Sequence, residues 1–233
     1  MKRWISAALA FAGVAALTVP AHAGLISVTG AMSSVGTAPA IIGAPSSILD
    51  DTAINTGMQG FNEAQNVVTT VAHGIDGGGS IAAGSRVDSH MIFLNSLGGS
   101  ALSHFDVIWT FSGEILGIMS DRGGTLESAS TFELGNPGTN YTSTFPGSGP
   151  AAPFNARGLE SNNGGGGPFP ADGYSLIAPN QLLVGMSVTE PGDWIRVVTA
   201  TPVPTPSTIT LLGVVLAGLG LGLGLNRRRL ASA

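Results

Sequence analysis

The chain ends in an apolar segment that a soluble domain would not readily accommodate. Residues 209–225 form an uncharged run of 17 residues rich in Leu, Val and Gly, and Arg227, Arg228 and Arg229 follow almost at once. As a helix this run would be roughly 25 Å long, at the short end of what crosses the hydrocarbon core of a bilayer. A core helix of a soluble domain is the alternative, but a terminal arginine cluster is hard to place in a core. We therefore predict a transmembrane helix over 209–225.

The arginine cluster also predicts an orientation for this helix. Positive charge beside a membrane-spanning segment favours the cytoplasmic side. Residues 226–233 are therefore expected to form a basic cytoplasmic tail, and the rest of the chain to lie outside the inner membrane.

The other end of the chain has the pattern of a secretory signal peptide. A basic start precedes an apolar stretch over 4–19, and Ala21 and Ala23 form a small-x-small cleavage site before Gly24. An uncleaved N-terminal anchor is the alternative, but it would usually have a longer apolar run and no proline at position 20. We expect cleavage, which would leave Gly24 as the first residue.

A proline-rich linker precedes the C-terminal apolar segment. Its central run consists of Val203, Pro204, Thr205, Pro206 and Ser207. Together with the signal peptide, the apolar helix and the arginine cluster, this run resembles the sorting signal of the PEP-CTERM class of exported bacterial proteins. Val203, Pro204, Pro206 and Ser207 match the motif of that family, whereas Thr205 stands where the family usually has Glu.

The resemblance implies partners and an address for the chain. The partners are the secretion machinery and an exosortase-type membrane enzyme, which cleaves near the motif in proteins of Gram-negative bacteria that make exopolysaccharide and biofilm. The chain would be anchored transiently in the inner membrane and would then reach the cell surface or the extracellular matrix, with extracellular polysaccharide as a further partner. The resemblance covers residues 203–233 and says little about the fold of the body.

The charge of the body limits its partners. Residues 24–206 contain four arginines and no lysine against all 14 acidic residues, which gives a net charge of −10. Phosphate binding needs clustered Lys and Arg, so nucleic acid and anionic lipid surfaces are poor partners for the body. The chain has no cysteine, which excludes disulfides, thiol catalysis and cysteine-based metal sites.

Short strands separated by Gly- and Ser-rich turns predict an all-β body. Residues 87–94 are expected to form a central strand whose odd- and even-numbered side chains face opposite ways. In 105–111, Phe105 is expected to face the same way as Val107, Trp109 and Phe111, and 115–119 to form a hairpin with this strand.

Further strands are predicted along the rest of the body. Residues 181–188 and 193–198 form a second expected pair around a Pro-Gly turn. One more strand is predicted within 61–73 and an edge strand over 25–29. Because no convincing helical period of ten residues is present, we predict a single antiparallel β-sandwich or jelly-roll-like domain.

These expectations give a linear layout for the chain. A Gly- and Pro-rich surface excursion is expected at about 136–173, partly ordered around Tyr141, Phe145 and Phe154. The predicted order is a signal peptide (1–23), the β body (24–200), the linker with the sorting motif (201–208), the transmembrane helix (209–225) and the tail (226–233).

The histidines of the body do not make a convincing catalytic group. Asp88, Ser89 and His90 could suggest a triad, but neighbours on a strand point to opposite faces and cannot form a relay. His73 and His104 are expected at strand rims or in loops. We assign no catalytic residue to them.

Other side chains of the body could bind a ligand or catalyse hydrolysis. Calcium could be held by loop carboxylates, for which the candidates are Asp50, Asp51, Asp76 and Asp172. Glycoside hydrolysis would need a carboxylate pair from among Glu63, Glu114, Glu127 and Glu133. Trp109 and Trp194 could stack on sugars, although tryptophan on an alternating strand is usually core. We therefore expect a non-enzymatic protein without cofactor or resident metal, with a carbohydrate- or calcium-binding module as the alternative.

Overall fold

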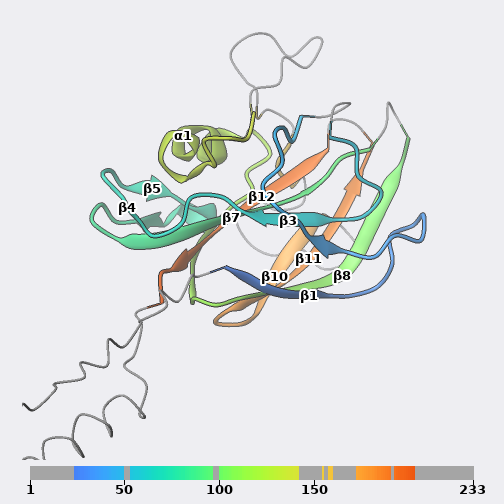
Figure 1. Ribbon diagram of the computed structural model, residues 1–233, viewed down its shortest axis with the longest axis horizontal. Helices are drawn as coiled ribbons and strands as arrows, with labels where there is room; N and C mark the ends of the chain where they lie inside the picture. Colours follow the sequence, from blue (N-terminus) through green and yellow to red (C-terminus); the bar gives the residue numbers. More distant parts are fainter. Residues whose placement is uncertain are drawn as a thin grey trace, which may run out of the picture. The chain divides into compact units, whose positions relative to one another are not determined.

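The described part of the body is built mainly from antiparallel β-strands and contains one α-helix (Figure 1). The computed structural model describes residues 24–49, 53–96, 100–141, 154, 157–159, 172–189 and 192–202. The predicted signal peptide, apolar segment and basic tail lie outside these residues. Within the described part of the chain, no helix is long and apolar enough to span a membrane.

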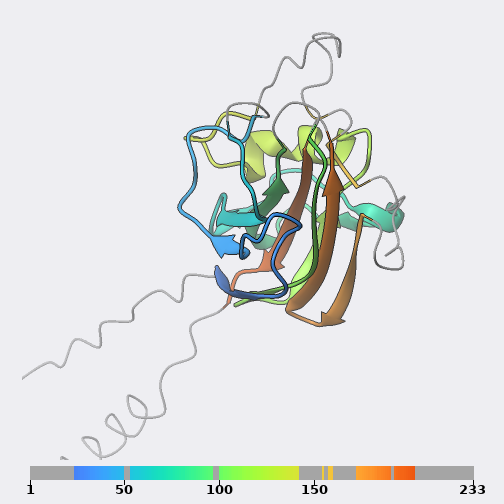
Figure 2. The same ribbon diagram turned by 90° about the vertical axis from the view of Figure 1, so that its right-hand side faces the viewer.

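One sheet has four strands, all antiparallel to their neighbours. Their order across the sheet is β1 (Leu25–Thr29), β8 (Leu102–Phe111), β11 (Gln181–Val188) and β10 (Gly173–Ala178). Figure 2 shows β8, β11 and β10 side by side. The prediction of an edge strand over 25–29 is confirmed, since β8 is the one described strand that pairs with β1.

The second sheet has six strands and centres on β7. Its main path runs through β2 (Ala40–Ile41), β3 (Gln59–Asn62), β7 (Arg86–Leu94), β12 (Asp193–Ala200) and β9 (Ile115–Met119), and β4 (Val67–Val68) also pairs with β7. Only the β2–β3 pair is parallel among the described pairs of this sheet. A separate hairpin joins β5 (His73–Gly74) to β6 (Ser80–Ile81) through the short 3₁₀ turn Asp76–Gly78.

The main hydrophobic core draws on both sheets. Ile92, Leu94 and Val197 of the six-stranded sheet belong to the same buried cluster as Val107 and Trp109 of the four-stranded sheet. The intervening residues of β7 and β12 point the other way into further buried clusters, so these two strands are buried along nearly their whole length. This confirms the predicted division of 87–94 into two faces.

The second face of the six-stranded sheet is covered by the helix and by a later segment. Helix α1 (Thr125–Leu134) contributes Leu134 to a cluster with Val87 and Val198. Tyr141 and Phe154 pack near Trp194, and their rings stack with centroids 6.4 Å apart. The six-stranded sheet therefore has packed layers on both sides.

The predicted hairpins are wrong, although their strands exist. Strand β9 pairs with β12 in the six-stranded sheet, not with β8, because residues 112–114 carry the chain from one sheet to the other. Likewise β11 pairs with β8 and β10, whereas β12 pairs with β7 and β9. Both connections change sheets instead of folding back within one.

The expected orientation of Phe105 is also wrong. At Asp106 the backbone has a φ of 56°, and the register with β11 shifts between Val184 and Met186. Such a bulge places two residues opposite one, so side-chain alternation changes phase there. His104 is buried at the position that simple alternation would give to Phe105, which is only half-buried.

Helix α1 was not predicted, because its buried stripe is largely polar. Glu127, Ser130 and Leu134 are its buried residues, at helical spacing, but two of the three are not hydrophobic. The Asp121 carboxylate accepts hydrogen bonds from the backbone N–H of Thr125 and Leu126, which satisfies two free donors at the start of the helix.

Two further segments differ from expectation. Residues 61–73 contain parts of three short strands (β3, β4 and β5) where one was predicted. In the predicted surface excursion, Tyr141, Phe154 and Leu159 are buried and contribute to hydrophobic clusters, and β10 begins at its end. Phe145 lies outside the described residues.

Candidate functional site

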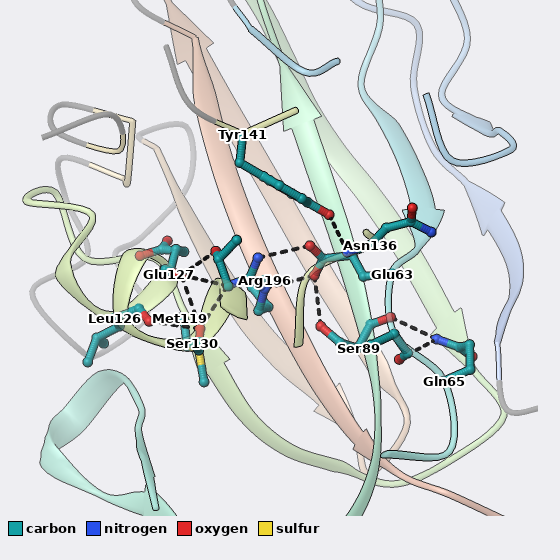
Figure 3. Close-up of polar contacts among 12 residues, drawn as sticks. Glu63, Gln65, Ser89, Met119, Leu126, Glu127, Ser130, Asn136, Tyr141 and Arg196 are labelled. Atoms are coloured by element: carbon teal, nitrogen blue, oxygen red, sulfur yellow. Dashed lines mark hydrogen bonds and ion pairs between the residues drawn. The ribbon is translucent and has the colours of Figure 1, made fainter. Parts of the chain in front are cut away.

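A buried ion pair lies on the covered face of the six-stranded sheet (Figure 3). Arg196 lies within β12, and Glu63 follows directly after β3. The Nε of Arg196 donates to Oε2 of Glu63 at 2.8 Å and Nη2 donates to Oε1 at 2.9 Å, so the contact is bidentate. Both side chains are 0% exposed. This geometry gives the strongest form of an arginine–carboxylate contact.

The remaining donors of the arginine join the sheet to helix α1. Nη1 of Arg196 donates to the backbone carbonyl of Glu127 and to Oγ of Ser130, both at 2.7 Å. On the other side, Oγ of Ser89 in β7 donates to Oε2 of Glu63 at 2.7 Å. Burial alone would lower the pKa of Arg196, but the charge of Glu63 raises it above its ordinary value. The cluster connects β3, β7, β12 and α1 through charged and polar groups.

Two titratable side chains border this cluster. Tyr141 lies with its ring centroid 5.8 Å from the guanidinium of Arg196, and burial raises its pKa well above the ordinary value. Its hydroxyl accepts a hydrogen bond from the backbone N–H of Asn136. Glu127 is also buried, and burial together with the charge of Asp121 raises its pKa well above the ordinary range. Both shifts favour the neutral side chains.

Of the four glutamates that are candidates for glycoside hydrolysis, two contact Arg196, but only Glu63 does so through its carboxylate. Glu63 binds its guanidinium, and Glu127 offers a backbone carbonyl to it. Glu133 accepts hydrogen bonds from the backbone N–H of Thr70 and from His73, at 2.6 and 2.5 Å. Glu114 is exposed, on the connection between the sheets. The Glu63–Glu127 cluster is enclosed by protein, so its geometry suits support of the fold.

The three histidines of the body are buried in strands β5, β7 and β8, so neither His73 nor His104 lies in a loop. His90 lies between the sheets, with Nδ1 2.9 Å from Oδ1 of Asn62 and Nε2 3.1 Å from Oγ1 of Thr199. Burial lowers the pKa of His90 to about 3. Nδ1 of His104 accepts from the backbone N–H of Met58, and its Nε2 lies 2.9 Å from the carbonyl of Ala31.

The considered triad is not assembled. Ser89 bonds to Glu63, whereas His90 contacts Asn62 and Thr199. Asp88 accepts from the backbone N–H of Asn66. The three neighbours serve separate contacts, as alternation along a strand predicts.

The described candidate ligands for calcium do not come together in one site. Asp76 accepts from the backbone N–H and the hydroxyl of Ser120 and from the Tyr174 hydroxyl. Asp172 accepts from the backbone N–H of Ser187. Asp50 and Asp51 lie outside the described residues. Within the described ranges, no group of three or more His, Asp or Glu is arranged to hold a metal ion.

The two tryptophans of the body are core residues. Trp109 is 0% exposed in the cluster between the sheets, and its Nε1 lies 3.3 Å from Sδ of Met58. Trp194 is 1% exposed; the guanidinium of Arg157 lies 4.6 Å from its ring centroid. Neither ring offers a surface platform for a sugar.

The outer face of the four-stranded sheet differs in chemistry from the buried cluster. Pairing aligns Thr29, Ile108, Leu183 and Ser175 in one row, and Ser27, Thr110, Gln181 and Ala178 in the next. Each of these side chains is exposed or half-buried. The two rows carry hydroxyl, amide and aliphatic groups and no charge. Among the surfaces of the described body, this face is the candidate for contact with an uncharged polymer.

The sorting residues are placed only in small part. Gly24 is described, and its carbonyl accepts from the backbone N–H of Ser112. The other residues of the predicted signals lie outside the described residues, and these are Ala21, Ala23, Val203, Pro204, Thr205, Pro206, Ser207, Arg227, Arg228 and Arg229.

The sequence patterns did not predict that Arg196 and Glu63 would meet in one buried cluster. A usable signal was present, since Arg196 is the one charged residue inside the apolar stretch 194–198. Its partner, however, lies 133 residues away. In comparisons with protein-family models, curated proteins and solved structures, nothing matched this chain.

Proposed function

We propose that this chain is an exported, non-enzymatic protein of the cell envelope or extracellular matrix, sorted by a PEP-CTERM-like C-terminal signal. The secretion machinery would remove the segment before Gly24. An exosortase-type membrane enzyme would then process the chain at 203–207, after transient anchoring by the apolar helix over 209–225. The mature body would reach the cell surface or an exopolysaccharide-rich matrix.

The position of the folded strands supports this proposal. Strand β1 begins at Leu25, one residue after the expected N-terminal cleavage, and β12 ends at Ala200, just before the linker. Because β12 has neighbours on both sides in the six-stranded sheet, processing within its length would remove part of the core. Processing at 203–207 would leave every described strand intact. This coincidence of fold and signal boundaries is the observation that carries the proposal.

We propose further that the two sheets form a jelly-roll-like β-sandwich that serves a structural or interactive role. The shared core and the two connections that change sheets favour this arrangement. The engagement of Arg196, Glu63 and His90 in internal contacts favours support of the fold as their role.

Carbohydrate binding on the same body is the second candidate. The outer face of the four-stranded sheet favours it, because Ser, Thr and Gln side chains in its two aligned rows can hydrogen-bond to sugar hydroxyls. Binding of extracted exopolysaccharide by the purified protein would test it. Ser175→Asp and Thr110→Asp should weaken such binding, whereas Ser128→Asp on the exposed side of α1 should leave it unchanged. Equal binding by all three variants would contradict contact at this face.

Intact-mass measurement of the mature protein tests the sorting proposal. In cells with the sorting enzyme, the surface or secreted form should begin at Gly24 and lack Arg227, Arg228 and Arg229. Without the enzyme, the arginines should remain. Pro204→Ala with Pro206→Ala should retain the tail, and Pro202→Ala, outside the matched motif, should be processed normally. A surface form that keeps its arginines in enzyme-containing cells would contradict the proposal.

A further inference from the structure

The two edges of the four-stranded sheet carry no second strand pair in the described structure, although the backbone N–H of Leu25 in β1 donates to Oδ1 of Asn62. Strands β1 and β10 lie at opposite ends of the sheet, and no described strand pairs with the outer side of either. An edge strand presents a row of backbone N–H and C=O groups that can pair with another strand. These edges are candidate sites for strand addition.

The chemistry of both edges permits such pairing. Neither β1 (LISVT) nor β10 (GYSLIA) contains a charged residue or a proline, the usual protections of an edge. Exposed aliphatic side chains lie on both strands, with Ile26 60%, Leu176 54% and Ile177 46% exposed. By contrast, the six-stranded sheet ends at one side in β2, which is only two residues long.

Each edge strand has one irregular position, which limits where a partner can pair. The register of β1 shifts between Leu25 and Ser27, and that of β10 shifts between Leu176 and Ala178. The regular stretches are therefore 27–29 and 173–176. They are of similar length, so one can pair with the other over three or four residues.

The direction of the strands fits a second copy of this chain as the partner. Four antiparallel strands alternate in direction, so β1 and β10 run opposite to each other. A second copy of this chain, displaced along the sheet without being inverted, therefore brings its β1 antiparallel to the β10 of the first. The alternation continues across the junction, as in an ordinary antiparallel sheet. The contact uses different surfaces on the two copies, so it can repeat along an open row.

We propose that copies of this chain associate head to tail, with β10 of one copy pairing with β1 of the next to continue the four-stranded sheet. This inference goes beyond the proposed function and does not rest on it, since both edges exist whichever compartment the chain reaches. Pairing joins the uncharged rows on the outer faces of successive four-stranded sheets.

The absence of cysteine from the chain allows a clean cross-linking test. Thr29 and Ser175 are exposed and lie in the same row across the sheet. Within one copy they are separated by two intervening strands, roughly 14 Å at the usual strand spacing, so no disulfide can join them. In adjacent copies the same two positions come together. A disulfide between them therefore reports a contact between copies.

The full-length double variant Thr29→Cys/Ser175→Cys, in mild detergent with gentle oxidation, should give a ladder of linked copies on a non-reducing gel. A 1:1 mixture of the two single variants should stop at dimers, and neither single variant should link efficiently alone. Ser27→Cys with Ser175→Cys covers a register displaced by two residues. Adding Leu176→Lys should reduce linking several-fold while the circular dichroism spectrum stays unchanged.

The matched control measures association driven by the apolar segment or by random collision. Ser128→Cys, on the exposed side of α1, is paired with Ser175→Cys for this purpose. The proposal is overturned if neither edge pair links more than this control does. It is also overturned if Ser175→Cys alone dimerises as readily as the mixture, since that result indicates a symmetric β10–β10 contact. Unchanged linking after Leu176→Lys would contradict pairing through the edge.

Discussion

The two sheets of this protein face very different surroundings. The six-stranded sheet shares one buried cluster with the four-stranded sheet, and its other residues share two further clusters with α1, Tyr141 and Phe154. The four-stranded sheet packs on its inner face, and its outer rows of side chains are exposed or half-buried. The charged pair Glu63–Arg196 lies in the covered sheet, whereas the accessible outer rows carry no charge.

The covered sheet therefore stabilises the fold, whereas the open sheet exposes side chains to solvent. Polar groups in the covered sheet connect strands to the helix, and removing one partner would leave another buried without compensation. Side chains on the open sheet have few such dependencies, so their chemistry can change with little effect on the fold. Four predictions test this division: three sets of substitutions, from the largest expected loss of stability to the smallest, and then a pH dependence.

Loss of the buried arginine should have the largest effect. Arg196→Met leaves the Glu63 carboxylate and the polar groups of α1 without their donor, and should lower the free energy of unfolding by about 3–5 kcal/mol. Urea denaturation measures the change. Arg86→Met is the matched control, because Arg86 is exposed and donates to Asn66; it should cost less than about 1 kcal/mol. Similar losses in the two variants would contradict a supporting role specific to Arg196.

Replacing an apolar side chain by Ala on the second face of each sheet should cost the two sheets different amounts of stability. Met91, fully buried on the covered face, should lose about 2–5 kcal/mol of stability on replacement by Ala. Leu183, half-buried on the open face, should lose less than about 1 kcal/mol on the same replacement. Thermal or urea unfolding of the two variants gives the comparison. A larger loss at Leu183 would reverse the division between the sheets.

The junction between the sheets is tested at Gly60. A Cβ at this position in β3 would lie 2.6 Å from Cζ3 of Trp109, so Gly60→Ala should cost about 1–3 kcal/mol through overpacking. Trp109→Phe removes the obstructing ring and should make the double variant more stable than the sum of the single losses implies. Gly43→Ala is the control, since nothing lies within 4 Å of its added Cβ. Additive losses at Gly60 and Trp109 would show that the two sites do not contact.

Low pH should lower the free energy of unfolding through protonation of His90, which lies between the two sheets. Burial lowers the pKa of His90 to about 3, so between pH 6.5 and 3 the unfolded chain binds this proton more readily than the folded chain. The contribution is fully present above about pH 6.5 and should decrease by about 1.4 kcal/mol per pH unit as the pH falls through this window. His90→Gln should remove that part of the pH dependence, as measured by urea denaturation at several pH values. Parallel pH profiles for the two proteins would exclude His90 as the source.

Local patterns of sequence predicted part of this fold. The alternation of 87–94 correctly gave the two faces of β7, because a strand buried on both sides keeps its apolar residues on each. The edge position of 25–29 also followed from local pattern. The sheet to which a strand belongs did not, since a turn such as 112–114 has the same composition whether it folds back or crosses between sheets.

The remaining features depended on context that local patterns lack. Helix α1 buries Ser130 against Arg196 and buries Glu127 one turn before it, so its buried stripe is largely polar. The bulge at Asp106 shifts alternation by one residue, which moved Phe105 outward. The candidate site depended on a contact between Glu63 and Arg196, far apart in sequence and each ordinary by itself.

Amide hydrogen exchange on the monomeric protein is the most direct test of the division between the two sheets. Amides of β7 and β12 should exchange slowest, at rates set by global unfolding, whereas those of β10 and β1 should exchange through local opening at least tenfold faster. This result would show that the covered sheet opens only on global unfolding, whereas the open sheet also opens locally. Equal protection of β10 and β12 in the monomer would contradict the account.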